Sequence, residues 1–297
     1  MKLFRPSNYC LISNRFKQIR YWKGISPDDW EKIESKEHDE IYEDSFPFDF
    51  KSYKIDPGHV IWWQDYCYLQ GRKKDKGHRT KQVFKLIELD KLNKKKILDI
   101  GCGNGQYSVF FAILGAEVYG CDISQKGILT AKKIAEANKV QDRCNFSVQN
   151  AACMNYSDNF FEIVLFHETL HHVIKYPNVR EEVLRVTKNG GRVICAEDLS
   201  ENPLIRIGAK ILQLGKKDKG DVPLRISDLE EFSKGFSSMK IEYMSLLFMT
   251  KRLLEGYINV PFVRKLLLFV KQFDDFLLKK IPSMRKYCGE FIMILVK

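Results

Sequence analysis

The chain has 297 residues, of which 44% are hydrophobic and 29% charged, and its formal net charge is +11. This apolar content can bury a large core, which excludes a disordered protein. The eight cysteines are scattered without a C-x-x-C pair, which favours a reduced, intracellular compartment. The N-terminus lacks the apolar region of a signal peptide and no apolar run approaches the ~20 residues of a membrane span, so we expect a cytoplasmic protein.

The positive charge is concentrated in two flanks of the chain. Residues 51–96 carry 13 basic and 5 acidic side chains, and residues 251–297 carry 10 and 4. Residues 97–250 are close to neutral, with 18 basic and 19 acidic side chains, and residues 1–50 are slightly acidic. A basic balance of this kind suits nucleic acid, an anionic membrane or an acidic substrate.

The first third of the chain differs in pattern from the rest. Residues 1–95 are aromatic and polar and end in the helix-like segment Thr80–Asp90. From Lys96 onward, short β-branched apolar runs alternate with longer helical stretches, which predicts crossover units and a parallel sheet. The first five expected strands are Ile97–Ile100, Glu117–Cys121, Asn145–Val148, Glu162–Phe166 and Arg192–Ala196, and the helices between them are Tyr107–Leu114, Lys126–Ala137 and Pro177–Val186.

The chain after the fifth strand completes the sheet. We expect a short helix at Ser227–Lys234, a strand at Lys240–Met249, a mostly helical stretch at Lys251–Lys280 and a last strand at Glu290–Val296. The fold class is therefore α/β, with a doubly wound seven-stranded sheet, mostly parallel with one antiparallel strand. The expected segments are an N-terminal helical appendage or cap (1–79), a core (80–250), and a C-terminal helical insertion with the final core strand (251–297).

The most informative motif is a glycine-rich turn after the first strand. Gly101, Gly103 and Gly105 stand at alternate positions, which lets the backbone approach a ligand and leads into a helix N-terminus. A dinucleotide fingerprint would have its third glycine at position 106, where this chain has Gln106, so NAD is disfavoured. Asp122 ends the next strand, 23 residues after Asp99, where a carboxylate can accept hydrogen bonds from ribose hydroxyls. With no phosphate-binding lysine in the turn, the pattern favours a nucleoside ligand without phosphates.

Several motifs in order resemble those of the class I S-adenosylmethionine-dependent methyltransferases, over roughly residues 80–250. Ile97–Gly105 resembles motif I, and Asp122–Ser124 resembles the acidic second motif. The remaining matches are Phe161–Leu165 for the fourth strand, Leu170–Val173 for the segment after it, and Glu182–Gly191 for the helix and turn before strand five. The resemblance implies a Rossmann-like fold and an enzyme that uses S-adenosylmethionine as its cofactor.

The resemblance also implies roles for individual residues in cofactor binding. Asp99 and Gly101 would lie against the methionine end, Gly103 and Gly105 would shape the turn with Cys102 as a small side chain, Asp122 would hold the ribose, and Ile123 would contact the adenine. Asn150-Ala151 stands where the family usually has Asp-Ala or Asp-Gly; the Asn150 side-chain carbonyl can accept the same bond from the adenine amino group. The backbone carbonyl of His167 would meet the cofactor's amino group.

Three further side chains near this pocket are candidate catalytic residues. His171 or His172 could take a proton from an acceptor, and Glu168 could contact it. The alternative is that the His pair has a packing or helix-start role. His59, His78, His167, His171 and His172 show no metal-ligand spacing with Cys or Asp, so we expect no metal site.

Acceptor specificity in this family comes from segments outside the core, here Trp62–His78, Asn202–Asp221 and Lys251–Tyr287. In residues 251–287 apolar side chains recur at helical spacing with basic residues between them, which is typical of either a lid helix or an interfacial helix on anionic lipid. We therefore expect methyl transfer to an oxygen or nitrogen atom of a small-molecule or lipid-linked metabolite, by a cytoplasmic protein that is peripheral on the inner membrane face if the interfacial reading holds. The alternatives are an RNA or protein methyltransferase and a non-catalytic binding protein; nucleic acid is disfavoured because no flipped-base motif or RNA-binding module is present.

Overall fold

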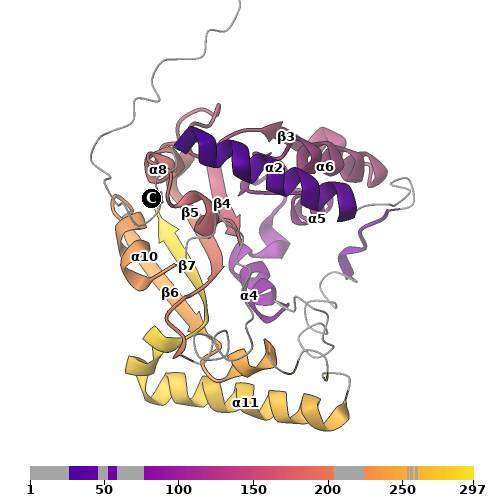
Figure 1. Ribbon diagram of the computed structural model, residues 1–297. Helices are drawn as coiled ribbons and strands as arrows, with labels where there is room; N and C mark the ends of the chain where they lie inside the picture. The colour runs from indigo at the N-terminus through magenta and orange to yellow at the C-terminus, as the bar shows by residue number, and fades with distance from the viewer. Residues whose placement is uncertain are drawn as a thin grey trace, which may run out of the picture.

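A computed structural model describes residues 27–45, 53–58, 77–203, 224–252, 254, 257 and 260–297. Its centre is a seven-stranded sheet of order β3-β2-β1-β4-β5-β7-β6 (Figure 1). Strand β7 is antiparallel to both of its neighbours and the other pairings are parallel, so the predicted fold class is confirmed. The strands are β1 (Lys96–Ile100), β2 (Glu117–Asp122), β3 (Cys144–Val148), β4 (Phe161–His167), β5 (Thr187–Asp198), β6 (Ser238–Met244) and β7 (Glu290–Val296).

Helices cover both faces of the sheet because successive strand residues point to opposite sides. Ile97 of β1 packs in a cluster with α4 and α5, whereas its neighbour Leu98 packs on the other face with α8 and α10. The helices are α2 (Pro27–Ser45), α4 (Gly77–Ile87), α5 (Gln106–Ile113), α6 (Gln125–Ala137), α7 (Leu170–Val173), α8 (Val179–Val186), α10 (Ile226–Phe232) and α11 (Pro261–Lys280), with short 3-10 helices η2 (Leu89–Lys91), η3 (Gln141–Arg143), η4 (Phe248–Arg252) and η6 (Pro282–Tyr287).

Two helices lie outside these layers. The indigo helix α2 crosses the upper part of the molecule and packs on α6, and the long yellow helix α11 runs along the lower end and packs on η4 and η6 (Figure 1). Among the described residues, none of the helices has both the length and the apolarity needed to cross a bilayer. The division into segments 1–79, 80–250 and 251–297 stays a prediction.

The structure corrects two predicted elements near the C-terminus. The predicted strand Lys240–Met249 ends at Met244, because Ser245 adopts a left-handed backbone (φ 61°) and the chain turns into η4. The predicted helix Lys251–Lys280 begins only at Pro261, whose fixed φ suits the first helical position. Similarly, the helix predicted from Pro177 starts at Val179, after Asn178 with a φ of 71°. At Ser245 and Pro261, local apolar periodicity continued through the change in backbone direction.

Candidate functional site

The glycine turn joins β1 to α5 with left-handed backbone at all three glycines, whose φ values are +70°, +53° and +70°. A Cβ on Gly101 would lie 2.2 Å from the Cγ2 atom of Thr169, and one on Gly105 would lie 2.7 Å from the Cβ atom of Ala131. Glycine is therefore required at these two positions both by the backbone conformation and by the close packing. The turn keeps the carboxyl end of β1 open toward its neighbours β2 and β4.

Asp122, at the end of β2, fixes the shape of this turn. One of its carboxylate oxygens accepts a hydrogen bond from the Gly103 N–H at 2.8 Å, and the other accepts one from the Ser124 N–H at 2.8 Å. Burial raises the pKa of this carboxyl, while the backbone bonds act in the opposite direction. Each carboxylate oxygen keeps further lone pairs, so Asp122 can hold the turn and still accept from a ligand hydroxyl.

Asp99 lies behind the turn rather than at its surface. It is buried, and one of its oxygens accepts a hydrogen bond from the Ser108 hydroxyl at 2.6 Å. Burial raises the pKa of this carboxyl to about 7, although the Ser108 bond opposes that shift. The family role that the resemblance implies for Asp99, contact with the methionine end of the cofactor, stays a prediction.

A cavity of about 300 Å³ opens beside the turn at the carboxyl ends of β1, β2 and β4. Sequence analysis predicted eight of the residues that line it: Gly101, Asp122, Ile123, Asn150, Ala151, His167, Glu168 and His172. The structure does not place Asp99, Cys102, Gly103, Gly105 or His171 among the lining residues. The lining residues that sequence analysis missed are Glu31, Glu34 and His38 of α2, together with Ile100, Cys121, Gln149, Thr169, Val173 and Tyr176.

Helix α2 contacts the loop after β3 through Glu31. The Glu31 carboxylate accepts a hydrogen bond from the Asn150 Nδ2 at 2.6 Å. The Asn150 Oδ1, which sequence analysis expected to face the adenine, accepts instead from the Ala152 N–H at 2.8 Å. A carboxylate from the N-terminal appendage therefore stands next to the position where the family usually has an aspartate.

Two further acidic residues of α2 tie this helix to the cavity wall. The buried Glu34 forms an ion pair with the buried Lys175 and accepts a hydrogen bond from the Tyr176 hydroxyl at 2.8 Å. One turn further on, the Asp39 carboxylate accepts from the Ser124 hydroxyl at 2.5 Å and from the Lys126 N–H at 3.0 Å, at the N-terminus of α6. These acids sit among nine in α2, a density that marks the helix as charged but does not say which of them face inward.

Glu168 is held by a buried arginine. It has a left-handed backbone (φ 61°), and its carboxylate forms an ion pair with Arg79 of α4, which also donates to Asp198 at 2.8 Å. Arg79 is fully buried, and the surrounding carboxylates raise its pKa against the effect of burial. The neighbouring His167 ring contacts the Thr80 hydroxyl at 3.1 Å.

The two adjacent histidines have different surroundings. The His171 Nδ1 lies 2.8 Å from the buried Glu197 carboxylate, whose other oxygen accepts from the Thr169 and Leu170 N–H groups at the start of α7. His172 lines the cavity, and its ring makes an edge contact with the His38 ring at 5.2 Å between centroids. His171 therefore belongs to the framework of α7, and His172 faces the space where a ligand would lie.

The chemistry of the lining fits a cationic nucleoside ligand. Among the described residues, four carboxyl groups and three histidines line the cavity, and no lysine or arginine does. Such a wall offers acceptors to hydroxyl and ammonium groups and has no cation for a phosphate. These are the properties that S-adenosylmethionine, with its ribose and its positive sulfonium, would need. In the described part of the chain, no group of three or more His, Cys, Asp or Glu side chains could hold a metal ion.

Comparisons with known proteins agree with this assignment. A family model described as "Methyltransferase domain" matches residues 91–241. A methyltransferase of Streptomyces halstedii, GfsG, is 25% identical over 156 residues, which are 52% of this chain and 55% of that protein. A ubiquinone biosynthesis O-methyltransferase of Dechloromonas aromatica is 32% identical over 148 residues, covering 47% and 62%. This chain thus spans little more than half the length of these two relatives.

A solved structure of phosphoethanolamine N-methyltransferase 2 from Haemonchus contortus, in complex with S-adenosylmethionine, is 16% identical with a TM-score of 0.49 over 80% of this chain and 56% of that one. This similarity is too distant to inform the substrate. The family model, in contrast, spans half of the chain and includes the glycine turn, Asp122 and the whole of β1 to β5. The chain belongs to the class I S-adenosylmethionine-dependent methyltransferase family.

Proposed function

We propose that this protein transfers a methyl group from S-adenosylmethionine to an oxygen or nitrogen atom of a small-molecule acceptor. The observation that carries the proposal is the cavity beside the glycine turn, with Asp122 in its wall and no lysine or arginine among its described lining residues. When bound, the cofactor supplies an electrophilic methyl group on a sulfonium. The chain's own contribution is to orient the two reactants and to exclude water. Orientation accounts for most of the acceleration in such transfers.

The cofactor would be held by residues from three strand ends. Asp122 would accept from the ribose hydroxyls, Ile123 would contact the adenine, and Gly101 would leave room for the methionine portion. Glu31 would add an acceptor at the adenine end, beside Asn150, where the usual family aspartate is missing. Asp99 would lie behind the turn, toward the methionine end of the cofactor.

Of the three predicted catalytic side chains, His172 is the best supported as a proton acceptor. It lines the cavity, whereas His171 is hydrogen bonded to Glu197 and the charge of Glu168 is balanced by Arg79. A base is needed only where the acceptor atom carries a proton that must leave. We infer that His172 takes that proton and that His171 and Glu168 are positioning residues.

The size and enclosure of the site support a small acceptor. Helix α2 forms part of the cavity lining and is attached there through Glu31 and Glu34, which limits access for a folded protein or an RNA. Two of the relatives have names that refer to small molecules. One is a 27-O-demethylrifamycin SV methyltransferase and the other is the ubiquinone biosynthesis O-methyltransferase. The predicted acceptor segments Trp62–His78 and Asn202–Asp221 lie mostly outside the described residues. Lipid linkage of the acceptor, and peripheral contact of residues 251–287 with the inner face of a membrane, are finer parts of this proposal.

Calorimetric titration with S-adenosylhomocysteine tests the cofactor site. We expect saturable binding by the full chain and a loss of roughly 100-fold or more in affinity for Asp122→Ala, because a charged acceptor is removed. The matched control is Asp142→Ala, an exposed acid in η3, which should bind as the unmodified protein does. Circular dichroism separates lost binding from lost folding, since Asp122 also holds two backbone N–H groups.

Equal affinity in a folded Asp122→Ala variant would contradict the proposed site, and no binding by the unmodified protein would favour a non-catalytic relative. The acceptor itself can be sought by metabolite profiling of a deletion strain. The substrate should accumulate there, and the product, heavier by one CH₂, should disappear.

A further inference from the structure

Helix α11 is already anchored to the fold by one of its faces. Leu267 packs with Phe248 of η4, and Leu278 packs with Leu246 and Cys288. Between these two contacts the buried Asp274 carboxylate accepts hydrogen bonds from the N–H groups of Leu247 and Phe248, both at 2.8 Å. The inward face therefore makes the contacts that hold α11 on the fold, as expected of a lid helix.

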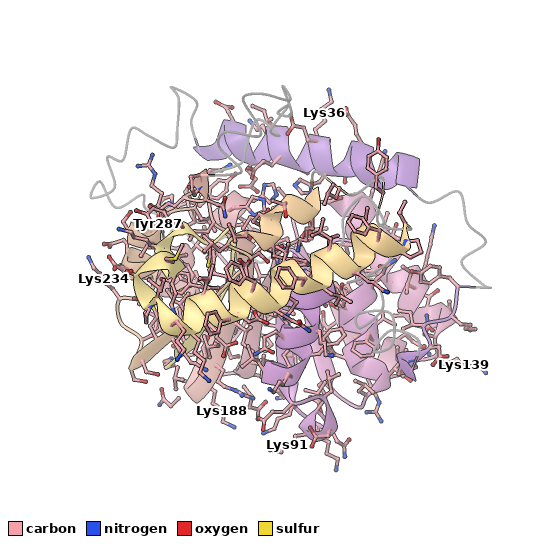
Figure 2. All side chains as sticks on the ribbon, turned by 90° about the horizontal axis from the view of Figure 1, so that it is seen from below. Lys36, Lys91, Lys139, Lys188, Lys234 and Tyr287 are labelled. Carbon is pink, nitrogen blue, oxygen red and sulfur yellow. The ribbon has the colours of Figure 1, made fainter. Side chains whose placement is uncertain are left out.

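A second apolar face of α11 points outward. It consists of side chains spaced alternately four and three residues apart, with these exposed fractions: Phe262 73%, Leu266 41%, Phe269 64%, Phe273 41% and Phe276 54%. The rings of Phe269 and Phe273 are stacked, with 6.3 Å between centroids. Tyr287, just beyond the helix, is exposed as well and lies beside its C-terminal end in Figure 2. Four exposed phenylalanines along one side of a helix form a contiguous patch of the kind that marks an interaction surface.

The charges around this outward face are mostly positive. Lys265, Lys279 and Lys280 are exposed on the helix, and Arg285 and Lys286 are exposed just after it. Negative charge on the exposed part of α11 comes from Asp275, which forms an ion pair with Lys271 at 2.7 Å. An aromatic stripe bordered by lysines matches the interfacial region of a bilayer that carries anionic lipid.

The same observations disfavour a second copy of the chain as the occupant. The four-three spacing would allow two α11 helices to pack along their stripes. Such a pair would bring Lys265, Lys279 and Lys280 of both copies close together with few acids to balance them. Anionic lipid supplies the opposite charge and takes up the phenylalanines in one contact.

The position of α11 relates this surface to the cavity. Asp274 contacts the chain just after β6. Glu290, the first residue of β7, lies opposite Asp198, the last residue of β5, in the antiparallel ladder of the two strands. Asp198 in turn shares Arg79 with Glu168 of the cavity wall. The anchor of α11 and the cavity are therefore at the same edge of the sheet, where the parallel strands end.

We propose that the outward face of α11, with its flanking lysines, docks on the surface of a membrane that contains anionic lipid. Docking rests on α11 alone; the delivery of a lipid-linked acceptor to the nearby cavity rests in addition on the proposed function. In this arrangement the phenylalanines enter the headgroup and upper acyl region, and the lysines contact lipid phosphates.

Flotation of the full chain with vesicles tests the docking. We expect binding to vesicles of phosphatidylcholine with phosphatidylglycerol and little binding to phosphatidylcholine alone. The triple variant Phe262→Ser, Phe269→Ser and Phe276→Ser should lose about tenfold or more in vesicle partitioning. The matched control, Leu129→Ser with Met239→Ser, removes exposed apolar side chains elsewhere and should bind as the unmodified protein does. Lys279→Glu with Lys280→Glu should weaken binding to the anionic vesicles.

Unchanged partitioning of the triple variant, or no binding of the unmodified chain to either vesicle, would overturn the proposal. So would sedimentation that shows a dimer which the triple variant dissociates, because the second copy would then be the occupant. Titration of the triple variant with S-adenosylhomocysteine keeps this test separate from the cofactor site. Its affinity should be unchanged whether or not the membrane proposal holds.

Discussion

Helices α2 and α11 are both added to the outside of the same sheet, but they are attached by opposite means. Helix α2 has nine acidic and two basic residues; Ile33 packs against the hydrophobic core, and hydrogen bonds and an ion pair from its acids hold the helix beside the cavity. Helix α11 is basic and apolar, and it is held mainly by hydrophobic contacts with η4 and with the chain after β6. Polar attachment fixes the position of each side chain near a ligand, whereas apolar attachment leaves a second apolar face available.

The largest effect should come from breaking the polar attachment of α2. In Glu34→Ala the buried Lys175 ammonium loses this counter-charge, so we expect a destabilisation of about 3–5 kcal/mol in the packing of α2. Limited proteolysis within α2 and denaturant unfolding measure it. The matched control Glu40→Gln changes an exposed acid on the same helix and should cost under about 1 kcal/mol. The double variant Glu34→Gln with Lys175→Met should recover much of the loss; if it does not, the ion pair is not what holds α2.

The second prediction concerns the buried ion pair beneath α11. Burial alone would raise the pKa of Glu290, but Lys251 and Arg79 lower it to about 2. Because the folded pKa lies below the ordinary value of 4.5, the stabilisation is present above pH 4.5 and is lost as the pH falls toward 2. It amounts to about 3 kcal/mol. Unfolding free energies between pH 6 and about pH 2 should therefore fall more steeply for the unmodified protein than for Glu290→Gln, and parallel curves would refute the assignment.

The third prediction tests the polar contact that Asp274 makes between α11 and the chain after β6. Asp274→Ala leaves the N–H groups of Leu247 and Phe248 without their acceptor, so we expect a loss of about 1–3 kcal/mol, felt first in α11 and η4. Hydrogen exchange can resolve the opening of α11 from that of the sheet. Asp275→Ala, the adjacent exposed acid, is the control and should change stability by less than about 1 kcal/mol. Equal effects of the two variants would mean that apolar packing alone holds the helix.

The smallest effect should distinguish contact with the cofactor from mere attachment. Glu31→Gln keeps the shape of the side chain but removes its charge, and we expect about a threefold to tenfold weaker binding of S-adenosylhomocysteine with little change in melting temperature. An analogue with inosine in place of adenosine lacks the amino group, so it should bind both forms with similar, weak affinity. A loss of affinity that is the same for both ligands would assign Glu31 to attachment only.

Much of the core and part of the site could be predicted from local pattern. Alternating apolar runs identify the strands β1 to β5 because each buries a short continuous segment, and the turn needs glycine wherever the backbone is left-handed. Asp122 could be identified because its place at a strand end is set by spacing along the chain. The pattern failed at Ser245 and Pro261, where apolar periodicity ran on through a change in backbone direction.

The sequence by itself determined the sheet, the glycine turn and the acid that faces it, because these depend on neighbouring residues and on the order of the strands. Only the tertiary structure decided that Glu31 and Glu34 reach Asn150 and Lys175, partners more than a hundred residues away. It also decided that His172 rather than His171 lines the cavity, and which apolar face of α11 is buried. In the sequence, two apolar faces of one helix look alike; they are distinguished only when one of them meets the rest of the fold.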